Sequence, residues 1–295
     1  MESENKRFGI KIDYERGSED PGRVFRAMSG LIESMQDFDQ HLAHTINAEV
    51  STILLLEDIE SGSVVTWLRN SLKSIPDEAL QELRWKRIFG QFAYEARNAV
   101  VEWLEHRETI SSRSEVQELQ GVIIEKAERT ELNRIPAYSP PPTNIILADV
   151  TSMKKALDNL KERDQALYLT DETERNFNHS FSVSEETVRE ILTLRTITSE
   201  AEAILQVKKP DYLGKSKWVF RYQGRQIEAS VIHSEWLREF QAQSQKVLPG
   251  DSLRAILKAE ISYGYEGEIV HEVFTVTNVR EAISMGGVSQ GHFWQ

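Results

Sequence analysis

The chain of 295 residues contains no cysteine. It can therefore form no disulfide, has no thiolate nucleophile and offers no cysteine ligand to a metal, a composition typical of a reducing compartment. Long apolar runs are also missing, because the longest, Ile53–Leu56, is far shorter than the roughly 20 residues that span a bilayer. The acidic start, Met1–Glu4, does not resemble a signal peptide. We therefore expect a cytoplasmic protein that contacts no membrane.

The motifs of several large enzyme classes are absent too. The chain has no Gly-rich phosphate loop ending in Gly-Lys-Ser/Thr, no Gly-x-Gly-x-x-Gly, no Gly-x-Ser-x-Gly and no His-Glu-x-x-His. These absences argue against a P-loop ATPase, a Rossmann dehydrogenase, an α/β-hydrolase and a zincin. No cofactor is expected.

What is present is an ordinary globular composition, with 40% hydrophobic residues and a net charge of −12. The length allows two domains. The patterns predict an α+β fold, in which a small OB-like β-barrel follows a mixed domain of strands and long helices. The expected divisions are an N-terminal domain (1–142), a helical connector (143–198), the barrel (199–281) and a flexible tail (282–295).

Strand and helix periods alternate in the N-terminal part. Residues 8–14 alternate like a half-buried strand, and Asp20-Pro21 opens a helix whose buried stripe is expected to run from Val24 through Leu42 to Thr45. A hairpin is expected at 50–68, and a long helix from Pro76 to His106. A helix from Ser114 precedes a proline-rich stop at 136–142.

The connector is expected to be mainly helical. Heptad spacing of Val150, Met153, Leu157 and Leu160 continues to Leu167, which predicts a helix over 149–169. Polar residues 170–180 indicate a loop, and a short helix follows at 184–194.

The last third has the period of a small barrel. Alternation predicts strands near 201–207, 218–222, 227–231, 253–261 and 270–279, with a helix at 234–245 between the third and fourth strands. Three strands, a helix and two strands are the element order of an OB-type barrel. Other small barrels share this order.

One basic segment stands out against the acidic chain. Residues 206–226 hold six cations and one acid. Cations that neutralise phosphates beside aromatic rings that stack on bases are typical of single-strand binders. The candidate nucleic-acid-binding residues are Lys208, Lys209, Tyr212, Lys215, Lys217, Arg221 and Arg225. The alternative is that the neighbouring Trp218, Phe220 and Tyr222 fill the barrel, and residues 206–280 carry only 11 basic groups against 9 acidic ones.

Two groups of residues are candidate metal sites. Asp37, His41 and His44 share one face of the first helix, but no fourth ligand is evident and we favour a solvated face, with no metal. Asp13, Glu57 and Asp58 lie on strands that would support a metal-dependent nuclease if they were neighbours. The Lys that such nucleases place two residues after an acid is missing, so this is the alternative function.

Three stretches resemble uncharacterised bacterial proteins from accessory and anti-phage defence gene neighbourhoods. They are Phe8–Tyr14, Leu56–Ser63 and Trp218–Asp251, in which Gly250-Asp251 opens the fourth barrel strand. The resemblance implies an accessory or antiviral defence role and brings no catalytic motif. We therefore expect a non-enzymatic binding protein of a bacterial cytosol, which acts through a protein partner or a homo-oligomer, with single-stranded nucleic acid as a further ligand of the barrel.

Overall fold

The computed structural model describes residues 6–15, 17, 19–60, 64–74, 83–135, 137–212 and 216–284. The fold is α+β, and the chain divides into two compact units, Met1–Ile191 and Leu192–Gln295. Residues 143–191 lie within the first unit, whereas their pattern predicted a separate connector. Within the described ranges, no helix has the length and apolar content that a bilayer crossing requires.

The first unit contains an antiparallel sheet with the order β2-β3-β1-β4-β5. Its strands are β1 (Phe8–Asp13), β2 (Ser51–Glu60), β3 (Val64–Ser74), β4 (Gln165–Leu169) and β5 (Glu174–Phe177). The predicted alternation of β1 is confirmed, because Phe8, Ile10 and Ile12 are fully buried. The predicted hairpin is formed by β2 and β3, and its turn lies outside the described residues.

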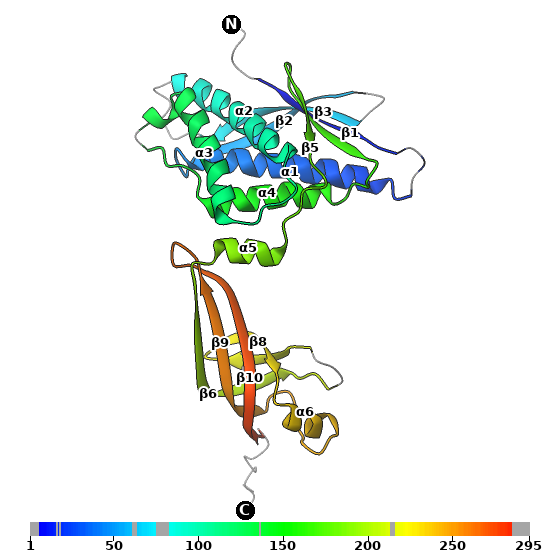
Figure 1. Ribbon diagram of the computed structural model, residues 1–295, viewed down its shortest axis with the longest axis vertical. Coiled ribbons are helices and arrows are strands. Elements are labelled where there is room, and N and C mark those ends of the chain that lie inside the picture. The colour runs from blue at the N-terminus through cyan, green and yellow to red at the C-terminus, as the bar shows by residue number, and fades with distance from the viewer. Residues whose placement is uncertain are drawn as a thin grey trace, which may run out of the picture. The chain divides into compact units, whose positions relative to one another are not determined.

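Helices pack against the sheet of the first unit (Figure 1), and Phe8, Ile10 and Ile12 of β1 are buried in its core. The helices are α1 (Gly22–His44), α2 (Leu83–Glu105), α3 (Arg113–Arg129) and α4 (Thr143–Leu157), and the short η2 (Leu132–Arg134) and α5 (Glu185–Leu192) follow α3 and β5. The predicted stripe of α1 is buried from Val24 to Leu42. The predicted start of α2, at Pro76, lies outside the described residues.

The helices α1 and α4 approach each other closely. A Cβ atom built on Gly30 of α1 would lie 2.8 Å from the Cβ of Ala156 and 3.3 Å from its Cα. Further along the same pair of helices, Nδ1 of His41 lies 2.7 Å from Oδ1 of Asp149. The contact therefore depends on the absence of a side chain at residue 30.

The helix predicted through Leu169 ends at Leu157 instead. The buried carboxylate of Asp164 turns the chain, because it accepts hydrogen bonds from the backbone N–H groups of Lys161 and Glu15 and two more from Arg23. Residues 165–169 then form β4 beside β1, and β5 occupies part of the predicted loop. Leu167 fits the heptad spacing by coincidence, since it belongs to a strand.

The second unit is a closed barrel with the order β10-β8-β7-β6-β9. Its strands are β6 (Arg195–Lys209), β7 (Trp218–Tyr222), β8 (Arg225–Val231), β9 (Ser252–Tyr263) and β10 (Ile269–Ile283), and α6 (Ser234–Gln241) lies between β8 and β9. Neighbouring strands are antiparallel except for β8 and β10, which run parallel over three residue pairs. All five strands and the helix were predicted, although β6 and β10 are longer than expected.

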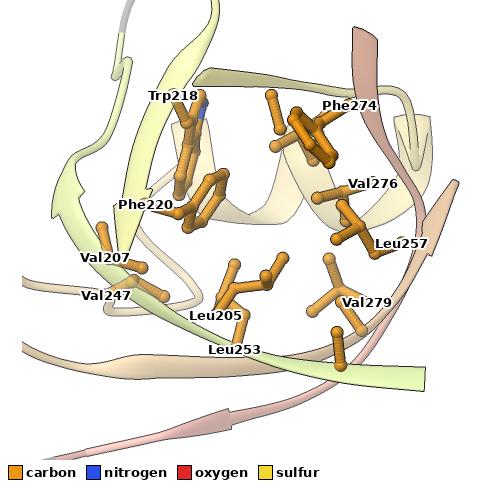
Figure 2. Packing of buried hydrophobic residues seen from close by; sticks show 14 of the residues in the cluster. Leu205, Val207, Trp218, Phe220, Val247, Leu253, Leu257, Phe274, Val276 and Val279 are labelled. Atoms are coloured by element: carbon orange, nitrogen blue, oxygen red, sulfur yellow. The ribbon is translucent and has the colours of Figure 1, made fainter. Parts of the chain in front are cut away.

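The inward-facing positions of these strands form the barrel core (Figure 2). Trp218 and Phe220 of β7 stack with ring centroids 5.9 Å apart, and Trp218 also contacts Trp236 and Phe240 of α6. Leu205, Leu253 and Val276 belong to the same core, and all three are fully buried. The aromatic residues of β7 therefore fill the barrel, as the alternative interpretation of the sequence predicted.

Three strands continue past the barrel as an antiparallel ribbon. Residues 195–202 of β6 pair with 256–263 of β9, and 269–273 of β10 pair with 260–263. Every residue of β6 from Arg195 to Glu202 is exposed. We call this part of β6, β9 and β10 the ribbon.

Candidate nucleic-acid interface

The basic segment places its cations along β6, β7 and the loop between them. Lys208 and Lys209 end β6, Lys217 directly precedes β7, and Arg221 lies within it. All four are exposed. Lys215 lies outside the described residues. The structure thus brings four of the predicted cations to adjacent strands, and we call Lys208, Lys209, Lys217 and Arg221 the basic face.

A row of polar side chains crosses three strands at the centre of this face. Gln206 of β6 pairs with Arg221 of β7, which pairs with Gln226 of β8. Nζ of Lys208 donates a hydrogen bond of 2.9 Å to Oε1 of Gln226. Because β7 turns Trp218 and Phe220 inward, its alternate residue Arg221 must point out of the barrel. The row is a consequence of the same alternation that builds the core.

A shift in register separates the two lysines at the end of β6. Val207 pairs with Phe220, and the next pair joins Lys209 to Val219, so that Lys208 is the extra residue. Such a bulge re-aims side chains at the rim of a barrel. Here it exposes consecutive lysines, which a regular strand would direct to opposite faces. Glu228 of β8 pairs with Val219 of β7, so one carboxylate lies next to these cations.

Arg225 is engaged elsewhere. Its Nη1 and Nη2 lie 2.8 Å from the two carboxylate oxygens of Glu272, and its guanidinium lies 5.4 Å from the ring centroid of Phe274. The hydrogen bonds raise the pKa of Arg225 and lower the pKa of Glu272. Its charge is therefore neutralised beside β10, and we leave Arg225 out of the basic face.

Tyr212 is also held in place. Its ring stacks on Phe240 of α6 with centroids 4.8 Å apart and planes 26° from parallel, and its hydroxyl donates to the carbonyl of Val247 at 2.9 Å. The residue as a whole keeps an exposed fraction of 43%. Tyr212 thus fixes the loop after β6 to α6, and one of its two ring faces is occupied.

The two histidines of the candidate metal site on α1 each have a partner outside that group. His41 pairs with Asp149, and the hydrogen bond between them raises the pKa of His41. Nε2 of His44 lies 2.6 Å from Nε2 of Gln40, while Asp37 is exposed. In the part of the chain that the structure describes, no three His, Asp or Glu side chains are grouped to hold a metal ion.

The acids of the alternative nuclease site do not meet. β3 lies between β1, which carries Asp13, and β2, which carries Glu57 and Asp58. Asp13 lies 2.8 Å from Nζ of Lys11, and Glu57 lies 2.5 Å from Nε of Arg69. Oδ1 of Asp58 accepts the backbone N–H of Ile59 at 2.8 Å. Each acid thus has its own local partner.

Two polar members of the site were missed in the sequence. Gln206 and Gln226 carry no charge and lie 20 positions apart, so neither stood out beside the cations. The signal was the alternation itself, because Gln226 is the outward neighbour of the inward Ile227 on β8. Pairing the predicted strands in register would have placed both glutamines beside Arg221.

Comparisons with known proteins found no matching family model, no matching curated protein and no matching solved structure.

Proposed function

We propose that this chain is a non-enzymatic binding protein whose barrel is of the OB type and contacts single-stranded nucleic acid through the basic face. The strand order and the helix between the third and fourth strands support the OB assignment, because both are features of that barrel. OB barrels bind oligonucleotides on the outer face of their second and third strands. In this chain those strands are β7 and β8. Arg221 of the basic face lies on β7, Lys217 directly precedes it, and Lys208 and Lys209 end the neighbouring β6.

The observation that carries the proposal is the row Gln206–Arg221–Gln226 with Lys208 beside it. The side chains of Lys208 and Arg221 reach a common surface from neighbouring strands, and the amide of Gln226, which pairs with Arg221 and binds Lys208, lies on the same surface. Lysine, arginine and amide groups contact phosphate oxygens without reading bases. The face therefore suits a phosphodiester backbone and predicts binding with little sequence preference.

The sequence predicted that both cations and aromatic rings would contact the nucleic acid, and the structure leaves few aromatic rings for this role. Trp218 and Phe220 are committed to the core, and Tyr212 stacks on α6. Affinity is therefore expected to come mainly from charge and to fall steeply with salt. Three or four neutralised phosphates correspond to a slope of about −2 to −3 in log affinity against log salt concentration for a single strand.

The rest of the functional hypothesis concerns the setting. The resemblance of Phe8–Tyr14 and Trp218–Asp251 to bacterial accessory and defence-associated proteins supports an accessory role in the bacterial cytosol. Asp13 and Glu57 have separate local partners and do not form a shared site. We accordingly propose the metal-dependent nuclease no further.

Fluorescence anisotropy with labelled single-stranded DNA and RNA tests the proposal. The double variant Lys217→Glu, Arg221→Glu is expected to lose at least tenfold in affinity at low salt, because two attractive contacts become repulsive. The matched control is Arg238→Glu with Lys258→Glu, which makes the same charge change on α6 and β9. The control is expected to keep most of the affinity.

Two results would contradict the proposal. One is wild-type protein that binds neither nucleic acid at low salt. The other is a control variant that loses as much affinity as the basic-face variant, since that would show a response to net charge alone. Circular dichroism of each variant checks that the barrel remains folded.

A further inference from the structure

The outer edge of β6 carries backbone groups that no described strand pairs with. β6 pairs with β7 at Gln206, Val207 and Lys209, so β7 covers only its end. On its other side, β6 pairs with β9 without a register shift from Arg195 to Gln206. One edge of β6 is therefore open for about ten residues, which is long for an edge strand.

The direction of the backbone groups follows from one hydrogen bond. The N–H of Val207 donates to the carbonyl of Asp251 on the β9 side at 2.7 Å. In antiparallel pairing, alternate residues bond to the same neighbour. Odd-numbered residues of β6 therefore bond to β9, and even-numbered ones point away. The outward groups belong to Thr196, Thr198, Glu200, Glu202 and Ile204.

The side chains along this edge alternate in character as well. Thr196, Thr198, Glu200 and Glu202 lie on one face of the ribbon. Arg195, Ile197, Ser199 and Ala201 lie on the other, which continues the inward face of the barrel. Ile197 keeps an exposed fraction of 47% although it pairs with Ile261 of β9. A strand added at the edge would cover part of Ile197 and satisfy the outward backbone groups.

We propose that the added strand is β6 of a second copy of this chain, paired antiparallel across a two-fold axis at Ser199. In this register Thr198 lies opposite Glu200 of the second copy, and Thr196 lies opposite Glu202. Each carboxylate then meets a hydroxyl that can donate to it, and no two acids are opposite each other. On the other face, the large Ile197 lies opposite the small Ala201.

The edge is self-complementary, which favours a second copy over an unrelated strand. The two-fold axis uses each Thr–Glu pair twice, so one strand supplies both the donors and the acceptors. A register centred on Glu200 would instead place two carboxylates opposite each other, which is destabilising. The repulsion between these carboxylates therefore favours Ser199 over Glu200 as the centre of the pairing. The joined ribbons form one six-stranded sheet.

A disulfide trap tests the register, because the chain has no cysteine of its own. Ser199 lies opposite Ser199 of the second copy as a pair without mutual hydrogen bonds, where Cβ atoms are close enough for a disulfide. Ser199→Cys is expected to cross-link mainly to twice the 33.9 kDa of one chain under mild oxidation. Thr196→Cys, equally exposed on the same strand, would lie far from its own copy and is expected to stay uncross-linked.

Charge variants measured by analytical ultracentrifugation add a second test. Thr198→Lys would face Glu200 and is expected to tighten the dimer about three- to tenfold, whereas Thr198→Glu would face the same acid and weaken it by a similar factor. Thr198→Pro removes an outward N–H without breaking the pairing with β9, and it is expected to yield monomers. A register centred on Thr198 would reverse the effect of the lysine.

The proposal is overturned if the wild-type chain is monomeric at tens of micromolar. It is also overturned if the two cysteine variants cross-link equally, or if Thr198→Pro leaves the dimer intact. These measurements contain no nucleic acid, and the basic face lies on residues 208–221. Failure of the dimer and failure of nucleic-acid binding are therefore separate results.

Discussion

Arg97 of α2 donates a hydrogen bond to the carboxylate of Asp39 of α1, and both side chains are fully buried. Asn70 of β3 donates to the other carboxylate oxygen, and the Arg97 guanidinium lies 4.5 Å from the ring centroid of Phe8 on β1. Two helices and two strands thus meet at one ion pair. Removing one partner would leave the other charge buried without compensation.

Asp39→Asn is therefore expected to lower the free energy of unfolding of the first unit by about 3–5 kcal/mol. Urea unfolding followed by circular dichroism at 222 nm measures this, because most helices belong to that unit. The control is Glu57→Gln, which breaks a partly exposed pair with Arg69 and should cost no more than about 1 kcal/mol. Equal losses in the two variants would contradict the assignment.

Asp164 predicts an acid-dependent loss of stability. Burial by itself would raise the pKa of this carboxyl, but hydrogen bonds from Arg23 and from the backbone of Lys161 and Glu15 lower the pKa to about 2. A lowered pKa stabilises the fold above the ordinary value of 3.8, and this stabilisation is lost as the pH falls from about 4 toward 2. In Asp164→Asn, the melting temperature should therefore depend less on pH between about 4 and 2. The exposed Asp171→Asn should keep the wild-type slope.

His41 predicts a loss of stability as the pH rises. Its hydrogen bond with Asp149 raises its pKa above 6.5. A raised pKa stabilises the fold fully below 6.5, and this contribution is lost as the pH rises through the raised value. His41→Gln keeps a donor for Asp149 but does not titrate, so its melting temperature should vary less above pH 6.5. A variant at the exposed His106 that flattens the curve equally would contradict this origin.

Gly30 predicts a steric limit between α1 and α4. Gly30→Ala would place a Cβ 2.8 Å from the Cβ of Ala156, and we expect a loss of about 1–3 kcal/mol because the helices must separate. Gly121→Ala on α3 meets nothing within 4 Å and should instead stabilise the protein by up to about 1 kcal/mol. Urea unfolding of both variants compares them. A stabilising effect at Gly30 would show that the helices adjust freely.

The barrel was predictable because its strands alternate strictly. The period of two is visible in a single sequence. On β7 the partly buried Val219 separates Trp218 from Phe220, and on β8 the exposed Glu228 separates Ile227 from Ala229. The inward direction of the two aromatic residues followed from the same period. The sequence did not predict that β6 extends beyond the barrel into the ribbon. The reason is that Thr196, Thr198 and Glu200 are polar and show no pattern of buried apolar residues.

The end of α4 and the strands β4 and β5 were not predictable in this way. Leu160 and Leu167 continue the heptad spacing of α4, and the turn between them depends on Asp164 meeting Arg23, which lies 141 positions away. β5 alternates the exposed Glu174 and Asn176 with Arg175 and the buried Phe177, so its polar composition resembled a loop. Local periodicity carries no information on such distant partners.

Some features of the candidate site could likewise be predicted from local sequence, and others depend on residues far away in the chain. The exposure of Lys208 and Arg221 follows from local alternation and from a bulge. The commitment of Arg225 to Glu272 depends on a residue 47 positions later, and that of Tyr212 depends on α6. Charge and aromatic content therefore identified the segment, but only the folded barrel distinguishes the exposed Lys208 and Arg221 from Arg225, which is paired with Glu272.

The closure of the barrel by β10 has a consequence for the order of events during synthesis. β8 and β9 each have an open side until β10 is inserted between them, and β10 is the last strand of the barrel to leave the ribosome. The sheet of the first unit is complete once Phe177 has been made, about a hundred residues earlier. If translation stalls after Phe177 but before β10 has been made, the first unit can complete its sheet while the barrel keeps unpaired strand edges. Such edges favour aggregation.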